Sequence, residues 1–281
     1  MSKPWALVCP TSRGIGHHLT RALLRRTSLP ILATCRSDPD GTKAALLAGL
    51  PDGDNGSLSS RLHMARVDVT DEDSVRAAAE SCASKHFPRD GGHHLRLAFA
   101  LPGVLRVDKA VEHVDYAQTL DSFRINTLGP LLLMKHFARF LPRGRSDMGS
   151  SGGGGGGDDK GVLPDHSIWV NMSARVGSVE DNRQGGWYTY RASKAAVNSL
   201  TRTFDWQLRN RAGRGDAAFA VAYHPGTVKT DFSKEFWAGA EARGDLQDPD
   251  KAAERMLDVI LGLKPEQRGR IWDWKGTEVP P

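Results

Sequence analysis

The chain has 281 residues, of which 39% are hydrophobic and 25% are charged, and its formal net charge is +5. These values are typical of a globular protein that is long enough to bury a large core. The basic residues are spread along the chain instead of forming a patch or motif, which argues against a nucleic-acid partner.

The cysteines and apolar runs exclude several further classes. Cys9, Cys35 and Cys82 form no CxxC pair, so neither a disulfide framework nor a zinc site is expected. Cys9 and Cys35 lie in apolar runs and are expected to be small buried core residues. No apolar run approaches the roughly 18 residues of a membrane span. The first strand-like run begins at Trp5, which leaves no room for a signal peptide. We therefore expect no membrane association and a cytoplasmic location.

Apolar, strand-like runs alternate along the chain with amphipathic helical stretches. Strands are expected at Trp5–Pro10, Pro30–Arg36, Leu62–Val69, Leu95–Leu101, Ser167–Ser173 and Ala217–His224. Helices are expected at Gly14–Thr27, Thr42–Leu50, Asp71–His86, Tyr116–Arg139, Tyr188–Arg211 and Pro249–Leu263. The strands are apolar throughout, as in parallel sheets that are covered on both faces. The pattern predicts an α/β fold: a Rossmann-type, doubly wound parallel sheet in three αβα layers, as one domain over residues 1–281.

Two segments interrupt this alternation as inserts. Residues 52–60 are polar and glycine-rich, and Gly149–Gly161 contains an unbroken run of six glycines followed by two aspartates. Such a run cannot bury enough apolar area to offset the entropy of ordering. The second insert is expected to be a mobile surface loop, with a functional lid as the alternative.

Residues 10–16, PTSRGIG, join the first expected strand to the first expected helix. The N–H groups and the positive dipole at a helix start attract phosphate, and Gly14 and Gly16 would let the backbone approach it. Pro10 stands where a dinucleotide-binding turn has its first glycine, but it has a fixed φ and no N–H. The rest of the turn must then cradle the phosphates: Thr11, Ser12, Arg13, Gly14, Ile15 and Gly16.

The ends of the next two strands indicate which dinucleotide binds. A fold that prefers NAD needs an acidic residue at the end of the second strand, to bind the ribose 2′-hydroxyl. This strand ends in Cys35 and Arg36. Arg36 and Arg13 would clamp a 2′-phosphate, which predicts NADP(H) in preference to NAD(H), although Asp38 is an alternative acidic partner. Asp68, at the end of the third strand, is expected to bind the adenine amino group or to act as a turn residue before a helix.

The sequence YRASK places Tyr190 and Lys194 four residues apart in an expected helix. They therefore share one helix face, about one turn apart. A lysine ammonium stabilises a nearby phenolate and is expected to lower the pKa of the tyrosine. The tyrosine could then donate a proton to a carbonyl oxygen near neutral pH.

Together these motifs resemble those of the short-chain dehydrogenase/reductase family. They are SRGIG, Asp68–Val69, FRINTLGP, NMSARVGS, YRASK and HPGTVKTD, and they run from residue 5 to about residue 275. The sequences ATCR, GGWYTYRASKAAVN and WDWKG look most like the carbonyl-reductase-like, C-signal-like branch. The resemblance implies an NADP-dependent oxidoreductase that reduces a small-molecule carbonyl to an alcohol, without a metal. It also implies a homodimer or homotetramer.

The family pattern carries over by position. It implies that Tyr190 is the proton donor, that Lys194 binds the nicotinamide ribose and tunes Tyr190, and that Asn126 holds a relay water where a helix distorts. It implies cofactor contacts at Asp68, Val69, Gly103, Asn126, Tyr190, Lys194, Pro225, Gly226, Thr227, Val228 and Thr230. Ala100–Gly103 stands in place of the family's NNAG, so the asparagines that brace the sheet are missing.

The substrate-polarising serine of the family falls on Ala174 in this chain. Ser173 lies one step earlier, and adjacent strand residues point to opposite faces. Ser173 can replace the missing hydroxyl only if the chain has already left regular strand geometry. We predict Ser173 as the fourth catalytic residue; Ser178, or no serine, is the alternative.

The remaining aromatic and histidine residues give weaker indications. The histidine pairs His17–His18 and His93–His94 have no metal-site spacing, so they are expected to be surface residues. Trp187 and Trp237 are expected either to wall a substrate pocket or to pack in the core. The apolar faces of the two helices at 116–139 and 188–211 would form a dimer interface or be buried within one chain.

A second function stays open from the sequence. Pro10, Ala174 and the missing asparagines all depart from the family pattern. They favour an NADP-binding regulatory or scaffold protein with little or no turnover as the alternative.

Overall fold

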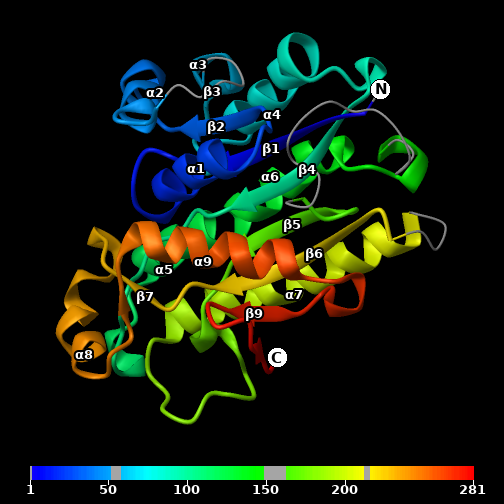
Figure 1. Ribbon diagram of the computed structural model, residues 1–281. Helices are drawn as coiled ribbons and strands as arrows, with labels where there is room; N and C mark the ends of the chain where they lie inside the picture. The colour runs from blue at the N-terminus through cyan, green and yellow to red at the C-terminus, as the bar shows by residue number, and fades with distance from the viewer. Residues whose placement is uncertain (1, 52–57, 149–162, 212–215) are drawn as a thin grey trace.

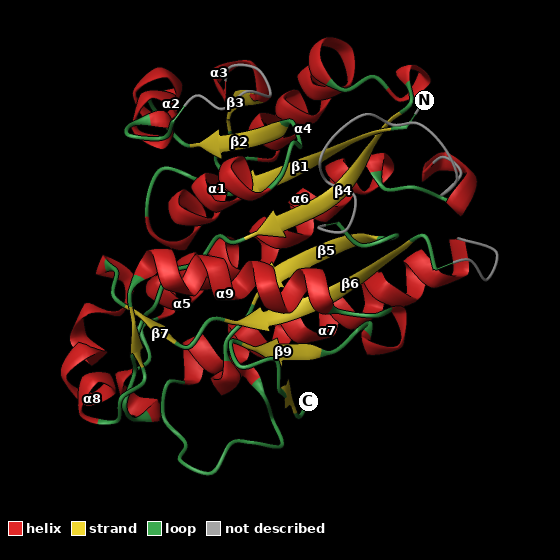
Figure 2. Cartoon of the chain, in the orientation of Figure 1, coloured by secondary structure: helices red, strands yellow, loops and turns green. Residues whose placement is uncertain are grey.

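The computed structural model describes residues 2–51, 58–148, 163–211 and 216–281. Eight strands of this part of the chain form one sheet in the order β10-β9-β6-β5-β4-β1-β2-β3 (Figures 1 and 2). All neighbours pair in parallel except β9 and β10, which are antiparallel. The strands are β1 (Lys3–Cys9), β2 (Ile31–Cys35), β3 (Leu62–Arg66), β4 (His93–Ala100), β5 (Ser167–Met172), β6 (Ala218–His224), β9 (Ile271–Asp273) and β10 (Glu278–Val279). The expected Rossmann-type, doubly wound sheet is confirmed.

Helices cover both faces of the sheet (Figure 1). The helices are α1 (Gly14–Arg26), α2 (Pro39–Leu47), α3 (Leu58–Arg61), α4 (Glu72–Ser81), α5 (Tyr116–Phe123), α6 (Gly129–Phe137), α7 (Tyr188–Arg211), α8 (Trp237–Ala242) and α9 (Pro249–Gly262). On one face α1 packs on α9, where Arg25 and Arg26 form ion pairs with Glu254 at 2.6 and 3.0 Å. On the other face lie α4, α6 and α7. Each face buries its own apolar cluster, as a parallel sheet requires.

Several boundaries differ from the sequence expectation for local reasons. Helix α2 begins at Pro39 because the Asp38 carboxylate accepts a bond from the Gly41 amide at 2.9 Å and caps the first turn. The single helix expected at 116–139 is divided by a π-helical turn, Arg124–Leu128. Helices α3 and α8, strands β9 and β10, and a small pair of strands, β7 (Thr227–Val228) and β8 (Leu246–Gln247), were not expected.

The two inserts fall mostly outside the described residues. The predicted Gly149–Gly161 loop lies outside them altogether. Residues 58–60 of the first insert belong to α3, where Leu58 is buried, so this end of the insert is helical instead of irregular.

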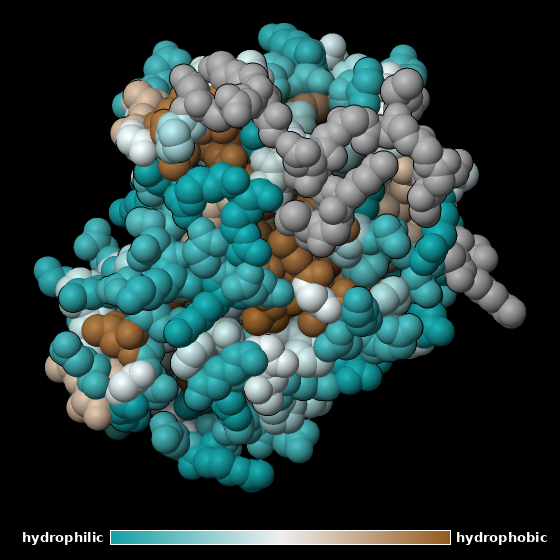
Figure 3. Space-filling view, viewed as in Figure 1, coloured by the Kyte–Doolittle hydropathy of each residue, from teal (hydrophilic) through white to brown (hydrophobic). Residues whose placement is uncertain are grey.

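The surface and the thiols show how the apolar residues are distributed. Hydrophilic residues cover most of the face that carries α1 and α9 (Figure 3).

Cys9, Cys35 and Cys82 are all buried and unpaired, and burial raises the pKa of Cys9 and of Cys82 to about 12. Both thiols are therefore protonated and unreactive near neutral pH. Within the described ranges, no helix combines the length and the apolar character that a bilayer crossing needs.

Candidate active site

Tyr190 and Lys194 lie one turn apart on α7, and both are buried. The Lys194 Nζ lies 5.9 Å from the centroid of the Tyr190 ring. The same Nζ donates a hydrogen bond of 2.8 Å to the carbonyl oxygen of Met172, the last residue of β5. This bond holds the amine at the carboxyl end of the parallel strands, where ligands bind in open α/β sheets.

Burial governs the protonation of both groups. Desolvation lowers the pKa of Lys194 to about 7 and raises the pKa of Tyr190 above its ordinary value. The direction for Tyr190 is opposite to the lowering expected from the lysine, because burial removes water from the phenol and disfavours the charged phenolate. The Tyr190 phenol therefore keeps its proton at neutral pH, whereas the Lys194 side chain gains and loses a proton near that pH.

Asn126 is the third member of this cluster and lies in the π-helical turn, as the expected helix distortion predicts. Its Oδ1 accepts from the Val104 amide at 2.7 Å, and its Nδ2 donates to the Val104 carbonyl at 2.9 Å. The Nδ2 also donates to the Ser193 hydroxyl at 3.0 Å, and that hydroxyl donates to the Tyr190 carbonyl at 2.8 Å. Asn126 thus ties the loop after β4 to the turn of α7 that carries Tyr190.

Gly103 shows that these elements converge. A Cβ added to Gly103 would lie 3.6 Å from each of three groups: Asn126 Oδ1, Lys194 Nζ and the Phe232 ring. The end of the β4 loop therefore faces the amine, the amide and an aromatic ring together. A ligand against the Gly103 backbone would be within reach of all three.

Ser173 directly follows β5, which ends at Met172. Its amide donates to the Tyr223 carbonyl at 2.8 Å, which continues the β5–β6 ladder. The Asn171 side chain bonds Thr201 of α7, and the Ser173 hydroxyl, two residues on, donates to Asn198 of α7 at 2.5 Å. The Ser173 hydroxyl thus points toward α7, and its single donor hydrogen is used by Asn198; its catalytic role stays a prediction.

The other serine is also occupied. The Ser178 hydroxyl donates to the Pro281 carbonyl at 3.1 Å and accepts from the Asp181 amide at 2.9 Å. Ala174, in an extended conformation between the two serines, contributes only a methyl group. Gly177 packs so close to α7 that a Cβ there would lie 2.8 Å from the Lys194 backbone.

The turn at the start of α1 accommodates Pro10 by close packing. A Cβ on Gly16 would fall 1.9 Å from the Pro10 carbonyl oxygen, so only glycine fits that position. Gly14 has φ +59°, and a Cβ there would lie 3.7 Å from the Thr230 methyl, which brings the turn beside the segment after β6. Thr11 is buried and bonds the Thr34 carbonyl through both its amide and its hydroxyl, at 2.7 and 3.0 Å. Four of the six expected cradle residues remain at least partly accessible to a phosphate: Ser12, Arg13, Gly14 and Ile15.

The strand-end residues expected to select the dinucleotide have different surroundings. Arg36 is exposed at the end of β2, whereas the Asp38 carboxylate is used to cap α2. The Asp68 Oδ1 accepts from the Thr70 amide and hydroxyl at 2.9 and 2.7 Å, and these bonds lower the pKa of Asp68. Val69 packs against Gly129, where a Cβ would lie 3.0 Å from the Val69 side chain.

The segment that follows β6 forms the next part of the site. Gly226 has φ +73°, and a Cβ there would lie 2.7 to 2.8 Å from the Gln247 and Trp274 side chains. Gln247 Nε2 donates to the Pro225 carbonyl at 2.8 Å, which holds this turn against β8. Thr227 and Val228 then form β7, and the Thr230 hydroxyl lies 3.4 Å from the Val228 carbonyl.

Aromatic rings surround Tyr190, and only Trp187 among them was expected. The Trp187 ring lies 6.3 Å from Tyr190 and 4.9 Å from Phe236, and Phe232 lies 6.3 Å from Tyr190. The phenylalanines come from a helical turn, Asp231–Phe236, that directly follows Thr230. The aromatic content of KTDFSKEFW was the one sequence signal for them. Trp237, by contrast, binds the Ser233 hydroxyl and stacks on the Lys229 ammonium.

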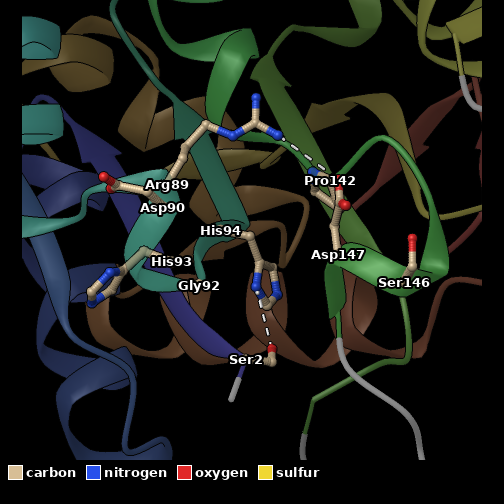
Figure 4. Close-up of a pocket in the computed structure, with 9 residues that line it drawn as sticks. All are labelled: Ser2, Arg89, Asp90, Gly92, His93, His94, Pro142, Ser146 and Asp147. Atoms are coloured by element: carbon tan, nitrogen blue, oxygen red, sulfur yellow. Dashed lines mark hydrogen bonds and ion pairs between the residues drawn. The ribbon is translucent and has the colours of Figure 1, made fainter.

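Of the expected surface histidines, His17 and His18 follow Gly16 in α1, whereas His93 and His94 lie at the start of β4, away from this site. His93 and His94 line a cavity of about 360 Å³ at the amino-terminal edge of the sheet, with Ser2, Arg89 and Asp147. Figure 4 shows how these residues lie. His94 is buried, which lowers its pKa to about 4, so it is not a surface residue as expected. In the described part of the chain, no three His, Cys, Asp or Glu side chains are grouped to hold a metal ion.

Comparison with known proteins places this site in context. No model of a protein family matches the chain. The 1-hydroxy-2-glutathionyl-2-methyl-3-butene dehydrogenase of a Rhodococcus species is 30% identical over 271 residues, which cover 96% of both chains. C-signal of Myxococcus xanthus is 36% identical over 171 residues, 61% of this chain and 83% of C-signal.

Solved structures show the same fold. The NADPH-bound carbonyl reductase from chicken fatty liver is 28% identical with a TM-score of 0.74, and the match covers all of both chains. The carbonyl reductase Sniffer of D. melanogaster has a TM-score of 0.76 at 22% identity, again over both whole chains. The similarity to these dehydrogenases and carbonyl reductases identifies the chain as an oxidoreductase that acts on CH–OH or C=O groups.

The chain belongs to the short-chain dehydrogenase/reductase family, in its carbonyl-reductase-like, C-signal-like branch. The family resemblance read from the sequence motifs is therefore confirmed.

Proposed function

We propose that the protein is an NADPH-dependent reductase that converts the carbonyl group of a small molecule to an alcohol, with Tyr190 as the proton donor. The observation that carries this proposal is the convergence of Tyr190, Lys194 and Asn126 beside Gly103 at the carboxyl end of the strands. The reduced nicotinamide, when bound, supplies the hydride that adds to the carbonyl carbon.

The residues of this chain move the proton. Because burial raises its pKa, Tyr190 holds its proton until negative charge develops on the substrate oxygen, and then donates it. Lys194, with a pKa of about 7, returns a proton to the phenolate. Asn126 donates through both Nδ2 hydrogens, which leaves one lone pair of Oδ1 to hold a water that resupplies Lys194.

The residues around the carboxyl edge fit a phosphorylated dinucleotide. The left-handed Gly14 and the close approach at Gly16 form a turn without side chains at the start of α1. Arg13 stands at the N-cap of α1 and makes no capping bond there. Arg36 is exposed at the end of β2, while Asp38 is used in a helix cap, so we propose that Arg36 and Arg13 bind a 2′-phosphate. The NADPH carried by the chicken reductase supports this preference.

The expected catalytic serine is not part of this proposal. Ser173 donates to Asn198 and Ser178 donates to Pro281, so Tyr190 polarises the carbonyl without a serine partner. Loss of one oxyanion donor costs about 3–4 kcal/mol in typical enzymes, so slow turnover is expected.

Tyr190→Phe tests the proton donor. We expect this variant to lose roughly 10²- to 10⁴-fold in the rate of NADPH oxidation with quinones, aldehydes or diketones, while NADPH binding is retained. Tyr188→Phe is the matched control, because Tyr188 is a second phenol at the start of α7 and is exposed. Activity that survives in Tyr190→Phe at the wild-type level would overturn the assignment.

A second candidate function is an NADP-binding regulatory or scaffold protein. Ala174, together with two serines that are bonded elsewhere, favours it, as does the similarity to C-signal. The two functions are separated by titration calorimetry with NADPH and a turnover assay on the same carbonyl panel. Tight NADPH binding without turnover of any compound would support the scaffold.

We further propose a homodimer. Tyr116, Leu120, Leu128 and Leu131 are exposed by 38 to 81% and follow one another at helical spacing along α5, the π-helical turn and α6. Leu120→Asp should shift the sedimentation coefficient to that of a monomer.

The buried free thiols support a cytoplasmic location, which is also part of the proposed function.

A further inference from the structure

Asp108 is a buried carboxylate that the proton path does not use. It lies in the loop after β4 and is 6% exposed. Its Oδ2 accepts from the Thr189 amide at 3.0 Å and from the Thr189 hydroxyl at 2.7 Å. Its backbone carbonyl accepts from the Trp187 amide at 2.6 Å. One residue thus holds both the first turn of α7 and the residue that precedes it.

The backbone held by Asp108 has an unusual conformation. Trp187 has φ +56° and follows Gly185 at φ +65° and Gly186 at φ +63°. Glycine adopts this left-handed region readily, whereas a tryptophan does so only when its surroundings hold it there. A Cβ on Gly186 would lie 3.3 Å from the Lys109 carbonyl, so the loop after β4 packs directly against this segment.

The left-handed turn directs the Trp187 ring to the active site. The ring meets Tyr190 edge to face at 6.3 Å and contacts Phe236 at 4.9 Å. Phe232, which is 44% exposed, lies 6.3 Å from Tyr190 on the other segment. A substrate whose carbonyl reaches Tyr190 must therefore lie against aromatic rings, which stack with planar rings better than with flexible chains.

We propose that Asp108 is a positioning residue: through Trp187 it sets the preference of the active site for ring-bearing over open-chain carbonyl compounds. This inference rests on the proposed reductase function. Asp108 does not touch the substrate; it fixes the backbone that carries the aromatic wall.

Two variants separate positioning from a general structural role. Asp108→Ala removes both bonds to Thr189, whereas Asp108→Asn keeps an oxygen that can occupy the Oδ2 position and accept both. We expect Asp108→Ala to lower the ratio of kcat/KM for acetophenone to that for 2-octanone by roughly three- to tenfold, mainly through KM. Asp108→Asn should restore the ratio, and NADPH affinity should be unchanged in both variants.

The dependence on Trp187 is tested by a double-mutant cycle. Trp187→Ala should lower the same ratio, and Asp108→Ala should add little in that background, because both act through one ring. If Asp108→Ala fails to fold, the ratio measured in Trp187→Ala still tests the proposal. An equal loss for both ketones in Asp108→Ala, or full additivity in the cycle, would overturn the proposal. So would an unchanged ratio in Trp187→Ala.

A binding measurement keeps this test independent of turnover. The dissociation constants of acetophenone and 2-octanone are measured in the presence of NADP⁺, which cannot donate a hydride. We expect acetophenone to bind more weakly to Asp108→Ala and Trp187→Ala than to the wild type, and 2-octanone to bind equally. If these differences in binding are found but the wild-type protein turns over neither ketone, the reductase function is refuted and the role of Asp108 is supported. Equal acetophenone binding by all three proteins would refute that role.

Discussion

A hydroxyl restored at position 174 should accelerate the reaction. Ala174 is buried and extended, and the side chains of Asn171 and Ser173, just before it, both bond to α7. Because adjacent strand residues alternate, residue 174 directs its Cβ to the opposite side from Ser173. In Ala174→Ser the new hydroxyl would lie at the position where the family resemblance implies a substrate-polarising serine.

The expected increase in kcat follows from the hydrogen bonds that the site already makes. An oxyanion donor is worth about 10²- to 10³-fold in kcat in established cases. Tyr190 already donates one hydrogen bond, and a buried hydroxyl without a partner costs about 1–3 kcal/mol in the free enzyme. We therefore expect kcat to rise by roughly ten- to a hundredfold, with a small loss in thermal stability.

The assay is the steady-state oxidation of NADPH with a ketone, and Ser173→Ala is the matched control. The Ser173 hydroxyl bonds Asn198, whose Nδ2 is already buried without a partner. Ser173→Ala should therefore reduce stability by about 1–3 kcal/mol and leave kcat of the folded enzyme unchanged. If Ser173→Ala abolished turnover and Ala174→Ser had no effect, Ser173 would be the donor and the strand argument would be wrong.

Three further predictions concern the cofactor, pH and stability. Arg36→Asp should shift the ratio of kcat/KM from NADPH toward NADH, and an unchanged ratio would remove Arg36 from the 2′-phosphate site. Reduction should slow as pH rises through about 7, because Lys194 with that pKa then loses the proton that it returns to Tyr190; a flat profile would contradict this. Asp205→Ala should lower the free energy of urea unfolding by about 3–5 kcal/mol, because it leaves the buried Arg268, 2.9 Å away, without this partner. A loss below about 1 kcal/mol would show that Asp216 alone suffices for Arg268.

Local pattern was enough to predict six of the eight strands of the sheet and the shared helix face of Tyr190 and Lys194. Apolar runs between helical stretches marked strands β1 to β6, and the four-residue spacing of Tyr190 and Lys194 placed both on one face of α7. The helix distortion at Asn126 followed from the family pattern. In each case the information lies in neighbouring residues or in a motif of fixed spacing.

The rest depends on contacts between distant segments. Asp108 and Thr189 are 81 residues apart, and nothing near Asp108 in the sequence marks it as a ligand for a helix start. Burial of Tyr190 reverses the expected direction of its pKa, and burial is a property of the whole fold. The bond from Ser173 to Asn198 likewise needed the register of β5 against α7.

The π-helical turn at Arg124–Leu128 sets the rotational phase between α5 and α6. Before the turn, Thr119 bonds Thr189 at the start of α7; after it, Gly129 packs against Val69, in the segment between β3 and α4. Removal of one residue from the turn would make the helix regular and rotate everything beyond it by about 100°. A bulky face of α6 would then meet Val69, where even a Cβ on Gly129 would lie only 3.0 Å away. The length of this short segment is therefore as tightly constrained as the identity of the asparagine within it.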